Sequence, residues 1–130
     1  MGRIAAIDFG LKRIGIAISD ERQKIAFPLE TVPNVAEIQK VLKKYSITLI
    51  LVGLPLLLSG KEGDMAAAVK KFAKDLEETT KIPVKLIDER FSSKIAEQSL
   101  REIHLNRKER SAKMDATTAA MLLQSYLDGL

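Results

Sequence analysis

The chain has 130 residues, 46% of them hydrophobic and 29% charged, which is enough for one compact domain and too few for two ordinary ones. It contains no cysteine, which excludes disulfides, thiolate nucleophiles and cysteine zinc sites. The formal net charge of +4 favours a polyanionic partner such as nucleic acid, although many metabolic enzymes are equally basic. The first residues, MGRIAAID, fit neither a signal peptide nor a membrane span, so we expect a cytoplasmic protein with no membrane partner.

The first third of the chain predicts three strands and a helix. Two isoleucine-rich runs, RIAAIDF and RIGIAIS, are joined by residues 10–12 and predict an antiparallel hairpin. A weaker strand, AFPLETV, contains Pro28, which favours an edge position because proline cannot donate to a sheet ladder. A helix is expected to start at residues 33–34, and its apolar face would carry Val35, Ile38, Leu42 and Tyr45.

The remaining elements alternate between strand and helix. TLILVG is a continuous apolar run and predicts a strand covered on both faces. Asp64 is expected to cap the next helix, and VKLID forms the last strand. Two more helices are expected at residues 93–103 and 112–127.

This order, β-β-β-α-β-α-β-α-α, predicts an α/β fold. The first two strands pair antiparallel, and the last two are parallel because a helical crossover joins them. We therefore expect a single domain over residues 1–130, with a central five-stranded mixed sheet flanked by helices on both faces.

Three segments are candidates for one site, and two of them carry acidic residues. Ligands of open α/β sheets bind outside the carboxyl ends of the parallel strands. Asp8, the GLP of residues 53–55 and the DER of residues 88–90 each follow such an end and would gather at one edge. Asp8 occupies the end of a strand that is otherwise core, where a carboxylate is costly unless something compensates it. A divalent cation shared between carboxylates is one such compensation.

A third acid, Asp115, shares a predicted helix face with Ala119, Leu122 and Tyr126, which should pack on the sheet. Each acid alone also has a plainer interpretation. Asp8 can bond to backbone amides at a strand end, Asp115 can cap a helix, and residues 88–90 can form a surface ion-pair cluster. Only the three together favour a metal site.

Four segments carry a family resemblance. They are AAIDFGLKRIGIAISD, LILVGLPLLLSGKEG, VKLIDERFSS and KMDATTAAMLLQSYLD. In order and spacing, from residue 4 to residue 128, they resemble the YqgF/RuvX family of RNase H-like nucleases, which are also described as Holliday junction resolvases. The resemblance implies an RNase H-like fold, a role in maturing the 5′ end of the 16S ribosomal RNA precursor, and possible contact with ribosomal particles.

The resemblance also implies roles for residues of this chain. Asp8, Glu89 and Asp115 match the family's metal-binding acids and would be both the catalytic residues and the ligands of Mg²⁺ or Mn²⁺. Asp88 is adjacent to Glu89 and could substitute for it or support it, but alternation along a strand lets only one of the two face the cleft. In a two-metal mechanism Asp8 would bridge both ions. No organic cofactor is implied.

Basic side chains are the expected nucleic-acid contacts. The run HLNRKERSAK at residues 104–113 can hold phosphates or can be a solvated loop with incidental charge, and the Lys-Arg step after D-x-G can be a plain hairpin charge. The full set of expected contacts is Lys12, Arg13, Arg90, Lys94, Arg101, Arg107, Lys108, Arg110 and Lys113.

One departure from the family pattern bears on activity. Where the family commonly has Asn and Asp in the loop after GLP, this chain has Leu57 and Ser59, which puts cleavage efficiency or substrate choice in doubt. Two functions of different class therefore stay open: a hydrolase that cuts structured RNA, and a non-catalytic nucleic-acid-binding module. Holliday junction resolution on DNA is a variant of the first and needs a two-fold dimer, an oligomeric state that the sequence does not specify.

Overall fold

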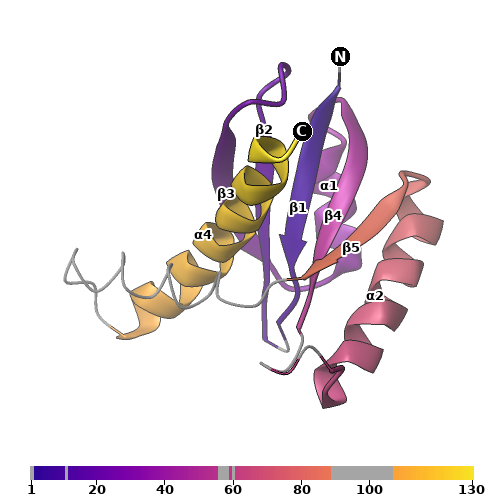
Figure 1. Cartoon of the computed structure of the whole chain (residues 1–130), viewed down its shortest axis with the longest axis vertical. Helices are drawn as coiled ribbons and strands as arrows, with labels where there is room; N and C mark the ends of the chain where they lie inside the picture. Colours follow the sequence, from indigo (N-terminus) through magenta and orange to yellow (C-terminus); the bar gives the residue numbers. More distant parts are fainter. Residues whose placement is uncertain (1, 11, 56–58, 60, 89–106) are drawn as a thin grey trace.

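A five-stranded mixed sheet forms the centre of the computed structural model (Figure 1). The structure describes residues 2–10, 12–55, 59, 61–88 and 107–130, with only the helical backbone for residues 107–115. The strands, in their order across the sheet, are β3 (Ala26–Val32), β2 (Ile14–Ser19), β1 (Arg3–Asp8), β4 (Ile47–Leu54) and β5 (Val84–Asp88). The helices described are α1 (Val35–Leu42), α2 (Asp64–Thr80) and α4 (Arg107–Asp128).

The strand pairing confirms the predicted sheet. β1 pairs antiparallel with β2, which continues antiparallel to β3, while β1–β4 and β4–β5 are parallel. The strand with Pro28 is at the sheet edge, as expected. That edge is also covered in part, because the Ala26 N–H donates to the Gln124 side chain of α4 over 2.9 Å. One backbone donor of the edge strand is thus occupied and Pro28 has none, which protects the edge from pairing with another chain.

Strand alternation divides the core into two layers. Ala5 and Ile7 of β1 belong to the cluster that contains the buried residues of α1 and α2, so we call this side the α1/α2 face. Ile4 and Ala6 belong to the second cluster, with Ala119, Ala120 and Leu123 of α4, on what we call the α4 face. In Figure 1 α4 crosses in front of the sheet and α1 lies behind it.

β4 confirms the expectation of a strand covered on both faces. Ile50 and Val52 pack in the α1/α2 layer and Leu51 packs in the α4 layer. None of the helices in the described part of the chain is long and apolar enough to cross a membrane.

Three expected helix limits differ from the structure. α1 starts after residue 34, as expected, and the Asn34 side chain caps it by accepting from the Glu37 N–H over 3.0 Å. The helix ends at Leu42, however, and leaves Tyr45 outside it. Asp64 does not cap α2: Gly63 occupies the cap position without a side-chain bond, and Asp64 is the first helical residue, where the helix dipole favours a carboxylate. α4 begins at Arg107, five residues before the expected start at 112, and the helix expected at 93–103 lies outside the described residues.

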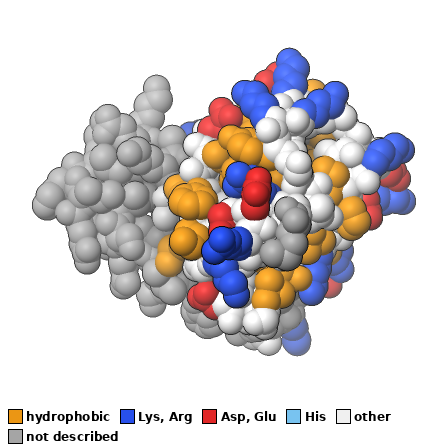
Figure 2. Space-filling view, turned by 90° about the horizontal axis from the view of Figure 1, so that it is seen from above, with side chains coloured by type: hydrophobic (Ala, Val, Ile, Leu, Met, Phe, Trp, Pro, Cys, Tyr) orange, Lys and Arg blue, Asp and Glu red, His pale blue; other side chains and the backbone are white. Residues whose placement is uncertain are grey.

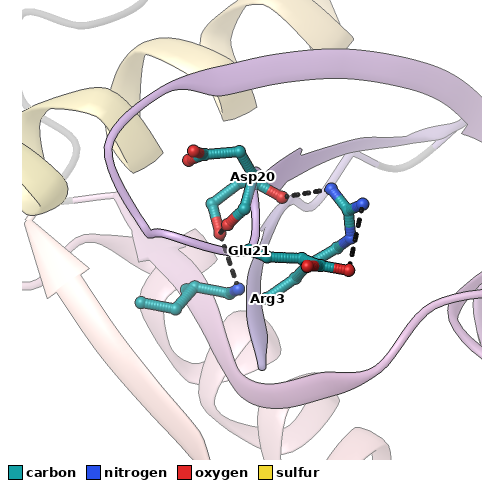
Figure 3. A network of polar contacts seen from close by, with 5 residues as sticks. Arg3, Asp20 and Glu21 are labelled. Carbon is teal, nitrogen blue, oxygen red and sulfur yellow. Dashed lines mark hydrogen bonds and ion pairs between the residues drawn. The ribbon is translucent and has the colours of Figure 1, made fainter. Parts of the chain in front are cut away.

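A polar network closes the end of the sheet where β1 begins (Figure 3). The Ser19 hydroxyl accepts from the Ile4 N–H and donates to the Asp20 carbonyl, both over 2.9 Å. Arg3 donates to the Ser19 carbonyl over 3.0 Å and lies 4.0 Å from Glu21. Asp20 accepts from the Lys24 and Ile25 N–H groups over 2.7 and 2.9 Å, which fixes the β2–β3 turn.

Replacing Ser19 by alanine tests the buried part of this network. Ser19 is 0% exposed, so the Ile4 N–H would lose its acceptor away from water, and we expect Ser19→Ala to lower the free energy of unfolding by about 1–3 kcal/mol. Urea titration followed by circular dichroism measures the change. Ser125→Ala, at an exposed serine of α4, is the matched control and should stay within about 0.5 kcal/mol of wild type. Equal effects of the two substitutions would contradict the assignment.

Asp20 gives the fold a predictable acid sensitivity. The N–H groups of Ile25 and then Lys24 hold the pKa of Asp20 below its ordinary value of 3.8. A carboxylate with a lowered folded-state pKa stabilises the fold above its unfolded pKa, and this contribution is lost as the pH falls through the folded value. We therefore expect Asp20→Asn to be less stable than wild type at pH 7, with the difference shrinking below about pH 4. Urea titrations at both pH values measure it, and a pH-independent difference would contradict the prediction.

Candidate active site at the carboxyl edge of the sheet

Parallel pairing brings three predicted segments to one edge of the sheet. β1, β4 and β5 run in the same direction, and their last residues are Asp8, Leu54 and Asp88. Ile7 is aligned with Val52, and Leu54 with Asp88, so the three ends lie at nearly the same level. The predicted gathering of these strand ends is confirmed.

The two aspartates at this edge belong to different faces. Asp8 follows Ile7, which packs in the α1/α2 layer, so alternation puts Asp8 on the α4 face, where it is half-buried. Asp88 is exposed and is aligned with Leu54, which packs in the α1/α2 layer. Ile87, two residues before Glu89, packs in the α4 layer. The alternation of side chains therefore places Asp88 and Asp8 on opposite faces of the sheet. An acid that shares the face of Ile87 is a better candidate for a site with Asp8.

Glycines flank Asp8 on both neighbouring strands. Gly15 of β2 is its antiparallel partner, and Gly53 of β4 follows Val52, the parallel partner of Ile7. Neither position has a side chain, and both glycines are buried. These glycines were not predicted as neighbours of Asp8, although each is an isolated glycine inside an apolar strand, which is a signal of close approach.

The turn after Asp8 requires Gly10. A Cβ at this position would lie 2.5 Å from the carbonyl oxygen of Arg13, which is part of the backbone and cannot rotate away. The glycine of D-x-G thus allows the chain to reverse directly after Asp8. The reversal leaves Lys12 exposed and Arg13 half-buried, close in sequence to the candidate carboxylate.

The other predicted site residues are placed only in part. Asp115 belongs to the N-terminal half of α4, which extends toward the carboxyl edge while its C-terminal end lies near the start of β1 (Figure 1). Glu89, Arg90, Lys94 and Arg101 lie outside the described residues. Four of the predicted basic contacts lie within α4, so this part of the basic run is helical. They are Arg107, Lys108, Arg110 and Lys113.

No group of three acidic or histidine side chains that could hold a metal is found among the residues that the structure describes. The described side chains include those of Asp8 and Asp88 but not those of Glu89 and Asp115. The convergence of Asp8, Glu89 and Asp115 therefore stays a prediction.

Comparison with known proteins identifies the family. The RuvX family, described as Holliday junction resolvase, matches residues 2–129. The chain belongs to the RuvX family. A relative from Protochlamydia amoebophila is 45% identical over 97% of this chain and 93% of its own length, and one from Endomicrobium trichonymphae is 41% identical over 98% and 96%. The names of both describe them as pre-16S rRNA nucleases.

A solved structure agrees on the fold. Thermus thermophilus RuvC in complex with a Holliday junction substrate superposes with a TM-score of 0.57 at 16% sequence identity, covering 98% of this chain and 97% of its own. At this identity the likeness concerns the fold alone, and it confirms the RNase H-like architecture. The RuvX family is one of nucleases, which supports a hydrolase that acts on nucleic-acid esters.

Gly10→Ala tests the turn that follows Asp8. The added methyl group would collide with the Arg13 carbonyl, so the hairpin must shift, and we expect a loss of about 1–3 kcal/mol in the free energy of unfolding. Gly129→Ala is the matched control, because the nearest atom to its Cβ would be 3.6 Å away. Urea unfolding of both variants checks the difference. A Gly10 variant as stable as the Gly129 variant would show that the turn does not need glycine.

Proposed function

We propose that this protein is a metal-dependent nuclease that hydrolyses phosphodiester bonds in the 5′-end processing of the 16S ribosomal RNA precursor. The observation that carries the proposal is Asp8. In a chain of the RuvX family, this half-buried carboxylate ends a core strand at the carboxyl edge of the sheet, with glycine beside it on each neighbouring strand. The choice of RNA as the substrate rests on the names of the relatives from Protochlamydia and Endomicrobium.

The donors available in this chain suit a hard divalent cation. Mg²⁺ and Mn²⁺ prefer oxygen ligands, and the chain offers carboxylates with no cysteine and a single histidine. Asp8, Glu89 and Asp115 would hold the ions. The alternation of side chains along β5 supports Glu89 over Asp88 as the ligand. Glu89 follows Ile87 by two residues, and Ile87 packs on the α4 face, which is also the face of Asp8. When bound, the ions supply a nucleophile from water and stabilise charge on the phosphate.

The protein's own residues position the substrate for this chemistry. Lys12 and Arg13, directly after the D-x-G turn, would contact the phosphates beside the scissile bond. The basic residues at the start of α4 would contact phosphates of the nucleic-acid strand that lie further from the scissile bond. These contacts orient the backbone and carry no base specificity.

A second candidate is cleavage of four-way DNA junctions. The family description names Holliday junction resolvases, and the RuvC structure contains a Holliday junction substrate. That reaction needs two active sites related by a two-fold axis, so it requires a dimer of this chain. The third candidate, a binding module without cleavage, is kept open by Leu57 and Ser59 in the loop after GLP.

Asp8→Asn is the decisive variant. The amide keeps the shape of the side chain but not its charge, so we expect cleavage to fall by at least about a hundredfold while RNA binding persists. Purified protein with Mg²⁺ or Mn²⁺ is assayed on precursor 16S RNA, duplex DNA and a four-way junction side by side. Cleavage by Asp8→Asn at the wild-type rate would overturn the catalytic assignment.

Asp88→Asn is the matched control for this experiment. It removes the same charge from the same edge, but on the α1/α2 face, and should keep most of the wild-type cleavage. Loss of cleavage in this variant instead would contradict the assignment by strand face. If neither wild type nor variants cut any substrate, yet all bind RNA with a steep salt dependence, the binding-module candidate is correct.

A further inference from the structure

A small cavity lies at the opposite end of the sheet from Asp8. It has a volume of about 150 Å³ and is formed where α1 and α2 end and where β4 and β5 begin. Its lining residues are Gln39, Leu42, Lys43, Tyr45, Ile47, Thr80 and Ile82. β4 runs from Ile47 at this cavity to Leu54 at the carboxyl edge, which separates the two by about 23 Å.

The cavity combines apolar, aromatic and cationic groups. Leu42, Ile47 and Ile82 supply apolar surface, Tyr45 supplies a half-buried aromatic ring, and Lys43 is an exposed cation in the lining. Typical drug-sized pockets have about 300–1,000 Å³, so this volume suits one planar ring system. The lining thus offers a stacking surface beside a positive charge.

The walls are held in place by bonds within the protein. Gln39 donates to the Thr79 carbonyl over 3.2 Å and so ties α1 to the end of α2. The Thr80 hydroxyl donates to the Leu76 carbonyl over 2.7 Å and accepts from the Ile82 N–H over 3.3 Å. These contacts fix both sides of the opening before any ligand arrives, which lowers the entropy lost on binding.

Tyr45 is positioned by the network at the start of β1. The Arg3 guanidinium lies 5.8 Å from the centre of the Tyr45 ring, in the range of a cation–π contact. Arg3 is itself held by the Ser19 carbonyl over 3.0 Å. The Tyr45 ring therefore has a supporting cation as well as apolar neighbours in the core.

Positive charge extends beyond the cavity. Lys40, Lys44 and Lys81 are exposed on the segments that border it, and Lys40 forms an ion pair with Glu37 over 3.2 Å. Figure 2 looks down on this end of the molecule and shows lysine and arginine side chains spread over it among acidic ones. Lys43 and Lys81 also occupy the C-cap positions of α1 and α2, where a cation is favourable in any case. That helix-end role does not account for a cavity with an aromatic wall.

We propose that this cavity binds one unpaired nucleotide of a single-stranded RNA segment, outside the site of cleavage. The base would stack against Tyr45 over the apolar floor, with its phosphate near Lys43 and the adjoining phosphates near Lys44 and Lys81. Unstacked bases of single strands are recognised in this way, by aromatic side chains beside basic ones. The choice of RNA as the polymer rests on the proposed function, whereas the nucleotide site itself does not.

The test measures binding without chemistry. A fluorescent single-stranded oligoribonucleotide is titrated into the Asp8→Asn variant with EDTA present, at several salt concentrations. Lys43→Gln should reduce the slope of log affinity against log salt by about 0.7, the value for one phosphate contact of a single strand. Lys71→Gln, at an exposed lysine of α2 outside the lining, is the control and should leave the slope unchanged. Equal slopes for the two variants would overturn the proposal.

A second variant tests stacking. Tyr45→Leu keeps apolar volume but removes the ring, and should weaken oligoribonucleotide binding at least about fivefold. Its fold is checked by circular dichroism, and Lys43→Gln, which changes an exposed side chain, decides the matter if Tyr45→Leu unfolds. Titration with 5′-AMP distinguishes a nucleotide of an RNA strand from a free nucleotide. If AMP binds as tightly as the oligomer, the proposed binding of an RNA strand is wrong and a free nucleotide is favoured.

The outcomes also separate this inference from the proposed function. Because binding is measured in a variant that lacks Asp8 and in the absence of metal, its result does not depend on cleavage. A protein that cuts no substrate, yet shows the Lys43 and Tyr45 effects, retains the nucleotide site without the nuclease activity. If the protein cuts RNA, but neither substitution changes its binding of the oligoribonucleotide, it has the nuclease activity without this site.

Discussion

The parallel pairing of β1 with β4 and of β4 with β5 is the constraint on which the candidate site depends. Asp8 and Asp88 are 80 positions apart in the sequence, and only the helical crossovers return the chain so that both strands end at one edge. An antiparallel β4 would place its GLP segment at the other end of the sheet. The same pairing brings the starts of β4 and β5 together at the opposite end of the sheet, where the cavity beside Tyr45 lies.

Within that edge, the two-residue alternation of a strand decides which residues of β5 lie on the same face as Asp8. Leu54 and Asp88 are aligned and belong to one face, whereas Ile87 and Asp8 belong to the other. A shift of one residue in the β4–β5 register would exchange the two faces, which is why a register fixed by buried Ile50 and Val52 matters to chemistry as well as to stability. The core therefore sets the geometry of the acids.

The sequence predicted those features that depend on local pattern. The hairpin, the edge position of the Pro28 strand, the two-sided burial of β4 and the start of α1 after residue 34 follow from neighbouring residues and are confirmed. The end of α1 before Tyr45 and the Gly63 cap were not predicted, because the apolar period continues past the last helical turn and a glycine gives no side-chain signal. The glycine pair beside Asp8 and the cavity depend on strand register and on contacts between distant elements, which one sequence does not encode in any local pattern.

The two ends of the sheet are linked through α4. The side chain of Gln124 accepts from the Ala26 N–H and donates to the Lys24 carbonyl, which fixes the C-terminal half of the helix to the β2–β3 hairpin. Asp115 lies nine residues earlier, about 14 Å along the helix axis in the direction of the carboxyl edge. Buried Ala119 and Ala120 between these positions are small enough to let the helix approach β1 and β2 closely. The candidate ligand and the hydrogen-bonded contact of Gln124 thus belong to one continuous helix that spans the α4 face.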